Sequence, residues 1–232
     1  MSAELSVIIP TLNAADRLGP CLGAVSEGLM AGLVRELILA DGGSEDRISA
    51  VADDLGARLV IAPRGRGTQL HAGAEAATGR WLLFLHADTL LPPDWAGTIT
   101  RHIRENPTKA GYFGLRFDSS HPMARMTAAW ANLRARIFGL PYGDQALLIS
   151  AALYAETGGF PAQPLMEDVA IARILGRRRL TRLAGHVITS AERYAREGWF
   201  RRGGRNLLTL ALYLAGRDPE KLVAWYRGGA QR

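Results

Sequence analysis

The first half of the chain alternates short apolar runs with stretches whose apolar residues recur at helical spacing. The apolar runs predict strands at residues 5–10, 37–40, 58–62 and 81–85. The stretches between and after them predict helices at residues 14–30, 45–55, 69–77 and 93–104. Strands that are apolar almost throughout are typical of a parallel sheet covered by helices on both faces. We therefore predict an α/β fold.

The second half of the chain is less regular. Strands are expected at residues 110–117, 146–150 and 187–194. Helices are expected at residues 122–138, 151–157, 167–175, 201–215 and 219–225. This order predicts a mostly parallel, mixed sheet completed by an antiparallel piece, with a C-terminal helical extension. No composition shift marks a linker, so we expect one domain over residues 1–232.

Polar side chains follow the first four predicted strands. They are Thr11 and Asn13 after the first, Asp41 after the second, Arg64 and Arg66 after the third, and His86 and Asp88 after the fourth. In an open parallel sheet, ligands bind outside the carboxyl ends of the strands. The sequence therefore predicts one polar edge that binds a ligand.

The net charge of +6 comes mainly from arginine. It is compatible with nucleic acid, an anionic membrane surface or a phosphorylated small substrate. Basic runs interleaved with aromatic residues, which stack bases, are missing from the sequence, and this argues against nucleic acid. Arginine forks suit diphosphates.

The single cysteine, Cys21, has no partner for an intrachain disulfide and fits a reducing, cytoplasmic setting. The N-terminal residues lack the basic and long apolar parts of a signal peptide. The apolar stretch at residues 207–215 is far shorter than the roughly 20 residues that a transmembrane helix needs. We expect no membrane span.

Four segments occur in a distinctive order between Ser6 and about Leu175: SVIIPTLN, LILADGGSEDR, RGRGTQLHAGAEAATGRWLLFLHADTLLP and MEDVAIARIL. This series resembles the family 2 glycosyltransferases, which have the Rossmann-like GT-A fold. The closer likeness is to a small bacterial subgroup of arsenosugar-biosynthesis and rSAM-selenodomain-associated glycosyltransferases. The resemblance implies a nucleotide-binding half at about residues 1–110 and an acceptor half with the C-terminal helices at about 111–232.

The resemblance assigns a nucleotide-sugar donor to the polar edge. The residues implied in donor binding are Pro10, Thr11, Asn13, Asp41, Arg64, Arg66, Gly67, Ala87 and Asp88. A carboxylate beside glycines at a strand end, such as Asp41, can approach a flat base closely. Glycine and arginine before a helix can hold a diphosphate. The competing interpretation is that these segments are a tight turn and a basic surface loop.

The segment His86-Ala87-Asp88 occupies the place of the family's Asp-x-Asp motif. That motif holds a divalent cation, Mn²⁺ or Mg²⁺, against the donor phosphates. Histidine replaces the usual first aspartate, and imidazole is a softer ligand than carboxylate. Two interpretations stay open: His86 and Asp88 both bind the metal, or Asp88 binds it alone while His86 contacts phosphate or ribose.

The pair Glu167-Asp168 matches the family's Glu-Asp pair, whose aspartate is the general base. Asp168 would take the proton of the acceptor hydroxyl as that oxygen attacks the anomeric carbon. The alternative is that both acids only favour the first turn of a helix. Weaker candidates for contacts with the acceptor or the diphosphate are Asp144, Gln145 and Arg193.

Near the C-terminus, Phe200 and the apolar residues of 207–214 alternate with Arg201, Arg202 and Arg205. We expect this helix to turn its apolar side toward the core and its arginines toward solvent. Peripheral contact with an anionic membrane on its inner face is left open.

Together these features predict a metal-assisted, inverting glycosyltransferase that transfers a sugar to an acceptor hydroxyl. The rivals are a sugar-nucleotide nucleotidyltransferase and a non-catalytic nucleotide-binding protein. The first rival usually has its Gly-rich loop directly after the first strand, where this chain has Pro10-Thr11-Leu12-Asn13. The sequence assigns no particular base, sugar, acceptor or oligomeric state.

Overall fold

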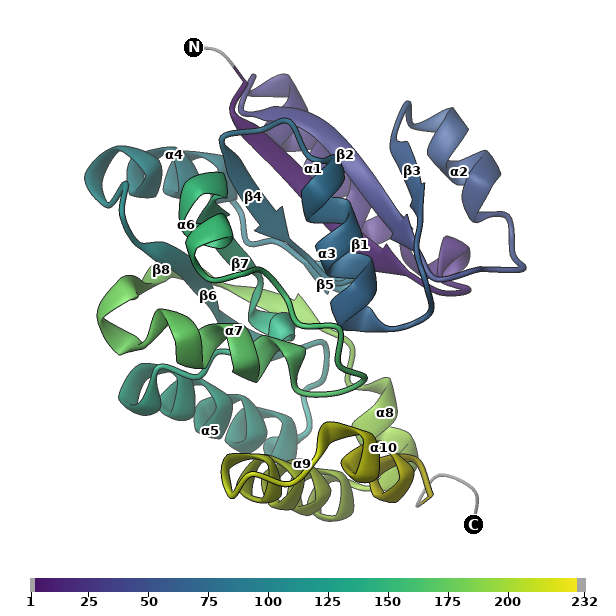
Figure 1. Cartoon of the computed structure of the whole chain (residues 1–232), viewed down its shortest axis with the longest axis vertical. Helices are drawn as coiled ribbons and strands as arrows, with labels where there is room; N and C mark the ends of the chain where they lie inside the picture. Colours follow the sequence, from purple (N-terminus) through teal and green to yellow (C-terminus); the bar gives the residue numbers. More distant parts are fainter. Residues whose placement is uncertain (1–2, 229–232) are drawn as a thin grey trace.

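The computed structural model describes residues 3–228. Its centre is an eight-stranded mixed sheet in the order β3-β2-β1-β4-β7-β6-β8-β5 (Figure 1). The strands are β1 (Leu5–Thr11), β2 (Val34–Asp41), β3 (Arg58–Ile61), β4 (Trp81–Phe84), β5 (Thr89–Leu90), β6 (Ala110–Phe117), β7 (Leu147–Ser150) and β8 (Leu180–Thr189). The α-helices are α1 (Gly19–Met30), α2 (Ile48–Asp54), α3 (Arg66–Ala76), α4 (Trp95–Glu105), α5 (Pro122–Phe138), α6 (Ala151–Glu156), α7 (Glu167–Leu175), α8 (Glu192–Glu197), α9 (Trp199–Leu214) and α10 (Pro219–Gly228). Short 3₁₀ helices are η1 (Ala15–Arg17), η2 (Gly143–Gln145) and η3 (Arg177–Arg179).

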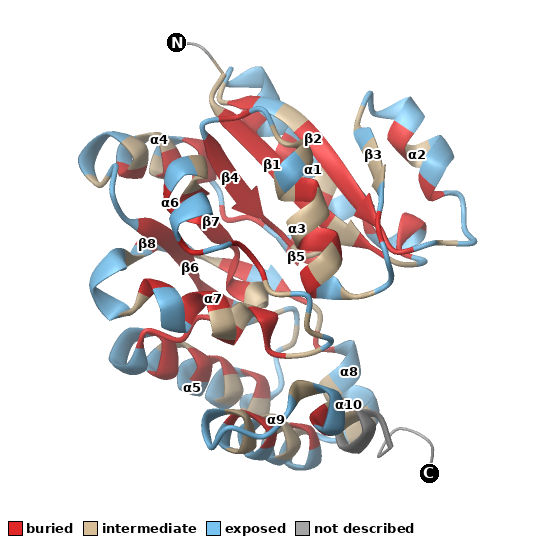
Figure 2. Ribbon diagram, in the orientation of Figure 1, coloured by how far each residue is buried: buried red, intermediate tan, exposed pale blue. Residues whose placement is uncertain are grey.

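The parallel half of the sheet consists of β3, β2, β1 and β4. Both faces of these strands are covered, so the odd and even positions of β1 enter different cores (Figure 2). Val7 packs with residues of α1, α2 and α4, whereas Ile8 packs with residues of α3, α6 and α7. This double cover explains why β1 has no polar alternation, and it confirms the predicted α/β architecture.

The second half adds the antiparallel piece. Strand β7 pairs antiparallel with both β4 and β6, β8 runs parallel to β6, and the two-residue strand β5 pairs antiparallel with β8. The sheet is therefore mixed, as expected.

Two predicted boundaries are wrong. The strand expected at 187–194 begins at Leu180 and ends at Thr189, and helix α8 follows it. It ends there because Asp118 accepts a hydrogen bond from the backbone N–H of Ala191 at 2.6 Å, which starts the helix. The helix expected at 14–30 is divided into η1 and α1, with Pro20 in the first turn of α1.

The C-terminal helices contradict a second expectation. The side chains of Arg202 and Arg205 are only 9% and 8% exposed, and both pair with Glu197 at the end of α8. Phe200 and Leu207 point to solvent instead. The half-buried Glu197 carboxylate provides the partner that allows Arg202 and Arg205 to face inward, opposite to the prediction. Arg201 is exposed and Leu210 is buried, as predicted.

Candidate active site

The loops after β1 and β2 are joined by side-chain hydrogen bonds. Thr11 donates its hydroxyl to Asp41 at 3.0 Å, and the backbone N–H groups of Gly43 and Ser44 donate to the same carboxylate at 2.9 and 2.7 Å. Burial would raise the pKa of Asp41, but the hydrogen bonds from Ser44, Thr11 and Gly43 lower it overall. Asp41 is buried and braces the loop through its own neighbours.

Asn13 and Gln69 complete this brace. The Asn13 side chain accepts from the N–H of Glu45 at 2.9 Å, and Asn13 itself has a left-handed backbone with φ 49°. Gln69, on α3, donates to the carbonyls of Thr11 and Ala40 at 2.6 and 2.8 Å. Three of the predicted nucleotide-binding residues, Thr11, Asn13 and Asp41, therefore lie together at the carboxyl ends of β1 and β2, where they hold the shape of two loops.

Helix α3 starts at Arg66 and brings it toward the first turn of α7. The Arg66 Nε atom lies 3.7 Å from Oε1 of the buried Glu167. Gly67 packs against the loop that precedes α7, since a Cβ atom on Gly67 would lie 2.3 Å from the carbonyl oxygen of Pro161. Close packing thus requires glycine at position 67, a reason that the sequence pattern did not suggest. Arg64 stays exposed on the loop before the helix.

His86, Ala87 and Asp88 follow β4. The Nε2 atom of His86 is buried and has no hydrogen-bond partner among the described residues. Burial, followed by the charges of Arg66 and Arg193, holds the pKa of His86 well below its usual value, so the ring is neutral near pH 7. Asp88 is exposed beyond it, immediately before β5. A neutral imidazole with a free nitrogen can accept a hydrogen bond or bind a cation.

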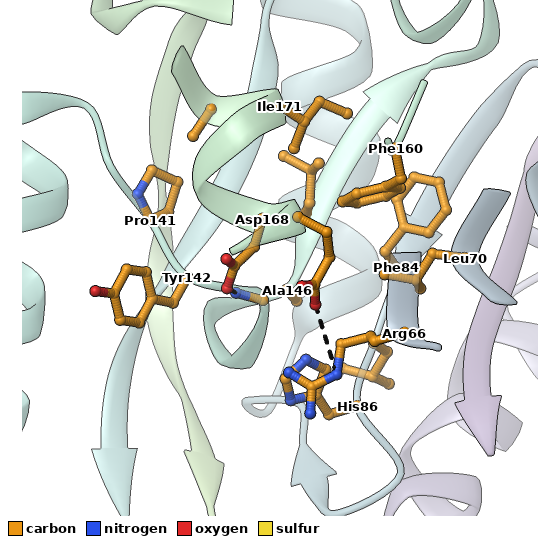
Figure 3. A pocket seen from close by; sticks show the side chains of 15 residues that line it. Arg66, Leu70, Phe84, His86, Pro141, Tyr142, Ala146, Phe160, Asp168 and Ile171 are labelled. Atoms are coloured by element: carbon orange, nitrogen blue, oxygen red, sulfur yellow. Dashed lines mark hydrogen bonds and ion pairs between the residues drawn. The ribbon is translucent and has the colours of Figure 1, made fainter. Parts of the chain in front are cut away.

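Asp168 lies across the pocket from His86 and Arg66 (Figure 3). Its Oδ2 atom accepts a hydrogen bond from the N–H of Gly143 at 2.8 Å, and its Oδ1 atom accepts from Val169 at 2.7 Å. Each oxygen retains a further lone pair. The carboxylate is therefore held in place and can still accept a proton.

The neighbouring carboxyl, Glu167, has different surroundings. Burial and the charge of Asp168 raise the pKa of Glu167, while Arg66 opposes that shift. The buried Glu167 holds its proton more tightly than an ordinary glutamate does. Like-charge repulsion within the pair thus suppresses ionisation of the glutamate.

The loop around η2 contributes a third carboxyl. Burial raises the pKa of Asp144 to about 6, with Asp168 adding to the shift and Arg134 opposing it. The guanidinium of Arg134 lies over the ring of Tyr142 at 3.4 Å and donates to the carbonyl of Leu140 at 3.0 Å. No role was predicted for Arg134. The one sequence signal for a role of Arg134 is its place beside the alanines that form the buried stripe of α5.

Two residues with left-handed backbones border this site. Ala146 has φ 53° directly after η2, and Met166 has φ 65° directly before Glu167. Such conformations are costly for residues with a side chain and concentrate at functional sites. They flank the two segments that the hydrogen bond from Gly143 to Asp168 connects.

Four of the predicted residues, Arg66, His86, Glu167 and Asp168, line one pocket. Thr11, Asn13 and Asp41 lie at or just after the ends of β1 and β2 and are not part of its lining. The pocket lining includes Arg66, His86, Gly143, Glu167 and Asp168, with Phe84 and Phe160 forming an apolar wall (Figure 3). Gln145 is buried away from the pocket and donates to the carbonyl of Phe113 at 3.1 Å, so it supports the loop. Arg193 is exposed on α8 within electrostatic range of His86. The sequence did not suggest the aromatic wall.

A family model described as "Glycosyl transferase family 2" matches residues 6–151, from β1 to the end of β7. The chain belongs to this family. Residues 6–151 contain the polar positions after β1 to β4, including His86-Ala87-Asp88, whereas Glu167 and Asp168 lie beyond them.

The curated relatives match over part of their length. A "PGL/p-HBAD biosynthesis glycosyltransferase" of Mycobacterium bovis is 41% identical over 109 residues, which are 44% of this chain and 42% of that protein. A "Glucosyl-3-phosphoglycerate synthase" of Mycolicibacterium smegmatis is 33% identical over 99 residues, 39% of this chain and 32% of the relative. The matches thus cover less than half of these relatives.

Solved structures share the fold across most of the chain. Glucosyl-3-phosphoglycerate synthase from Mycobacterium tuberculosis, in complex with Mn²⁺, uridine diphosphate and glucosyl-3-phosphoglycerate, has a TM-score of 0.61 and 19% identity, covering 93% of this chain and 81% of that one. Staphylococcus aureus TarS residues 1–349, in complex with UDP-GlcNAc, has a TM-score of 0.59 and 14% identity, covering 81% and 58%. These similarities confirm the GT-A-like fold.

Proposed function

We propose that this protein is an inverting glycosyltransferase that moves a sugar from a nucleoside-diphosphate sugar to an acceptor hydroxyl, with Asp168 as general base. The observation that supports this most directly is the position of Asp168. Its carboxylate is fixed by Gly143, retains free lone pairs and faces the pocket across from Arg66 and His86. Family membership and the fold support the class of reaction.

The donor would lie along the edge formed by the loops after β1 to β4. Thr11, Asn13 and Asp41 shape the nucleotide end of this edge, with Asp41 exchanging one of its loop partners for the base. Arg64 and Arg66 lie toward the diphosphate, and Arg193 adds positive charge from the other side. Related proteins solved with UDP or UDP-GlcNAc support a nucleotide-sugar donor.

A divalent cation fits this edge only together with the donor. Among the described residues, no three His, Cys, Asp or Glu side chains are grouped as a metal cage. The unpartnered Nε2 of His86 and the exposed carboxylate of Asp88 are two suitable ligands, and the donor phosphates would complete the set. Bound Mn²⁺ or Mg²⁺ would neutralise charge on the departing diphosphate.

The protein's own groups then divide the work. Asp168 takes the acceptor proton as the acceptor oxygen attacks the anomeric carbon. Glu167 positions Arg66, since the Arg66 Nε atom lies 3.7 Å from its Oε1 atom. Attack from the side opposite the leaving diphosphate inverts the anomeric centre. Asp144, whose Oδ1 atom has no hydrogen-bond partner among the described residues, would order acceptor hydroxyls.

Replacing Asp168 by asparagine tests the proposal. Asp168→Asn preserves size and the hydrogen bond from Gly143 but cannot accept a proton. Turnover should fall by about 10²–10⁴ while donor affinity changes little, since the proton is taken only as the transition state forms. The measurements are turnover and nucleotide-sugar affinity on the same purified variant, with Asp54→Asn on α2 as the matched control.

Collapse of donor affinity together with activity would make Asp168 a structural or nucleotide-binding residue. Near-normal turnover in Asp168→Asn would remove it from the mechanism. A nucleotidyltransferase needs no base at this position, and a binding protein has no turnover to lose, so both rivals predict no selective loss of kcat.

A further inference from the structure

Helix α9 presents its apolar side to solvent. Phe200, Leu207 and Leu214 are 76%, 51% and 45% exposed. Together with Gly204 and Ala211 they recur at helical spacing, so they form one stripe along the helix. The opposite side of α9 contains the buried Arg202 and Thr209, while Leu210 is the one large apolar residue of the helix that is buried. A water-soluble surface helix normally has the reverse arrangement.

Helix α5 has a second outward stripe. Met126, Trp130, Leu133 and Ile137 are each between 45% and 55% exposed, and their spacing places them on one side of the helix. The buried side of α5 is formed instead by small alanines. The apolar side chains of α5 are thus larger on the outside than on the inside.

The two helices are neighbours. They lie side by side at the end of the molecule away from β3 (Figure 1). The ring of His121, which caps α5, stacks on Trp199 at the start of α9, with centroids 5.7 Å apart. Apolar side chains exposed in numbers on neighbouring helices mark a candidate interaction site.

The surroundings of the stripes are cationic. Neither α5 nor α9 contains an aspartate or a glutamate. Arg125 and Arg136 are exposed along the same edge of the α5 stripe, and Arg177 packs against Gly139, the residue that ends α5. This combination of apolar side chains with flanking arginines matches the interface of an anionic bilayer.

We propose that α5 and α9 form a docking face for the surface of an anionic phospholipid bilayer. The apolar stripes would enter the boundary between headgroups and acyl chains, and the flanking arginines would contact lipid phosphates. No helix in the described part of the chain has both the length and the apolarity to cross a bilayer. Docking therefore means lying on the surface. A second copy of the chain is disfavoured as the partner because two cationic faces would meet.

Vesicle co-sedimentation of the full chain tests this proposal. The protein should bind vesicles of phosphatidylcholine mixed with phosphatidylglycerol and should not bind vesicles of phosphatidylcholine alone. Leu133→Gln should weaken binding by about fivefold, because the lost apolar contact involves about half of a leucine side chain. Leu55→Gln is the matched control, since Leu55 is 44% exposed and Leu133 is 47% exposed.

Charge is tested separately. Arg136→Gln should weaken binding to the mixed vesicles by about fivefold, the usual contribution of one basic residue near an anionic surface. Arg80→Gln, at an exposed position before β4, should leave binding unchanged. Thermal unfolding of all four variants should match that of the parent, which shows that they fold.

Three results would overturn the proposal. The first is that the protein does not bind the mixed vesicles. The second is that Leu133→Gln and Leu55→Gln lose vesicle binding equally. The third is a dimer that forms without lipid and that Leu133→Gln dissociates. The last result would assign the face to a second copy of this chain. None of these measurements depends on glycosyl transfer, so they stand or fall independently of the proposed reaction.

Discussion

Polar groups are buried for different reasons in two regions of the molecule. One region is the donor edge, formed by the loops after β1 to β4, and the other is the docking face of α5 and α9. At the donor edge, buried polar groups such as Asp41 and Thr11 hold the backbone of loops that a ligand would contact. In α9, the buried Arg202 and Arg205 meet Glu197, which frees the outer side for apolar residues. In the first region, a buried charge therefore holds a loop in shape. In the second, buried charges accompany a helix whose apolar side faces solvent.

The largest expected effect lies at the donor edge. Asp88→Ala should reduce transfer by at least about 10³, since a bound cation contributes several kcal/mol of charge stabilisation. The fold should persist because Asp88 is exposed in the loop between β4 and β5. Transfer is measured across a Mn²⁺ titration, with Asp54→Ala on α2 as the control. Full activity of the parent in excess chelator would contradict a metal role.

The next effect tests the inverted helix. Glu197→Gln should lower the free energy of unfolding by about 3–5 kcal/mol, because two buried arginines lose their charged partner. Glu192, on the same helix, pairs with Arg17 at 3.5 Å but is 55% exposed, so Glu192→Gln should cost less than about 1 kcal/mol. Urea unfolding of both variants measures the difference. Equal losses of unfolding free energy in the two variants would show that the charges buried at α9 have no special role in stability.

The smallest expected effect is a gain in the free energy of unfolding. The fold raises the pKa of Asp144 to about 6, so its neutral form is favoured and its stabilising contribution is lost as pH rises from about 4 to 6. Asp144→Asn should therefore equal the parent at pH 4 and exceed it by about 1–3 kcal/mol at pH 8. Thermal and urea unfolding at both pH values check this. A variant less stable than the parent at pH 8 would show that the Asp144 charge is compensated.

Local patterns predicted the elements that local forces determine. The bounds of β6, α5 and α7 agree with the predicted ranges, because an apolar run, a proline at the helix start and an acidic first turn are all visible in sequence. The polar positions after β1 to β4 also lie at the predicted edge. These features depend on residues within a turn or two of one another.

The failures depend on distant partners. The end of β8 is decided by Asp118, which is 73 residues away from Ala191 along the chain. Strand β5 has two residues and exists only because it pairs with β8. The role of Arg134 depends on folding back over Tyr142, and the aromatic wall joins β4 to Phe160 across the sheet. Hydrophobic periodicity contains no information about such partners.

The contact of Gly67 with the Pro161 carbonyl has a mechanical consequence. Because no side chain separates α3 from the loop before α7, the two cannot slide past each other as packed helices do in shear motions. Arg66 and Asp168 therefore move as parts of one rigid body. Residues 141–146 are attached to the same body, because the backbone N–H of Gly143 donates to Asp168 at 2.8 Å, so the carboxylate is held from both sides of the pocket.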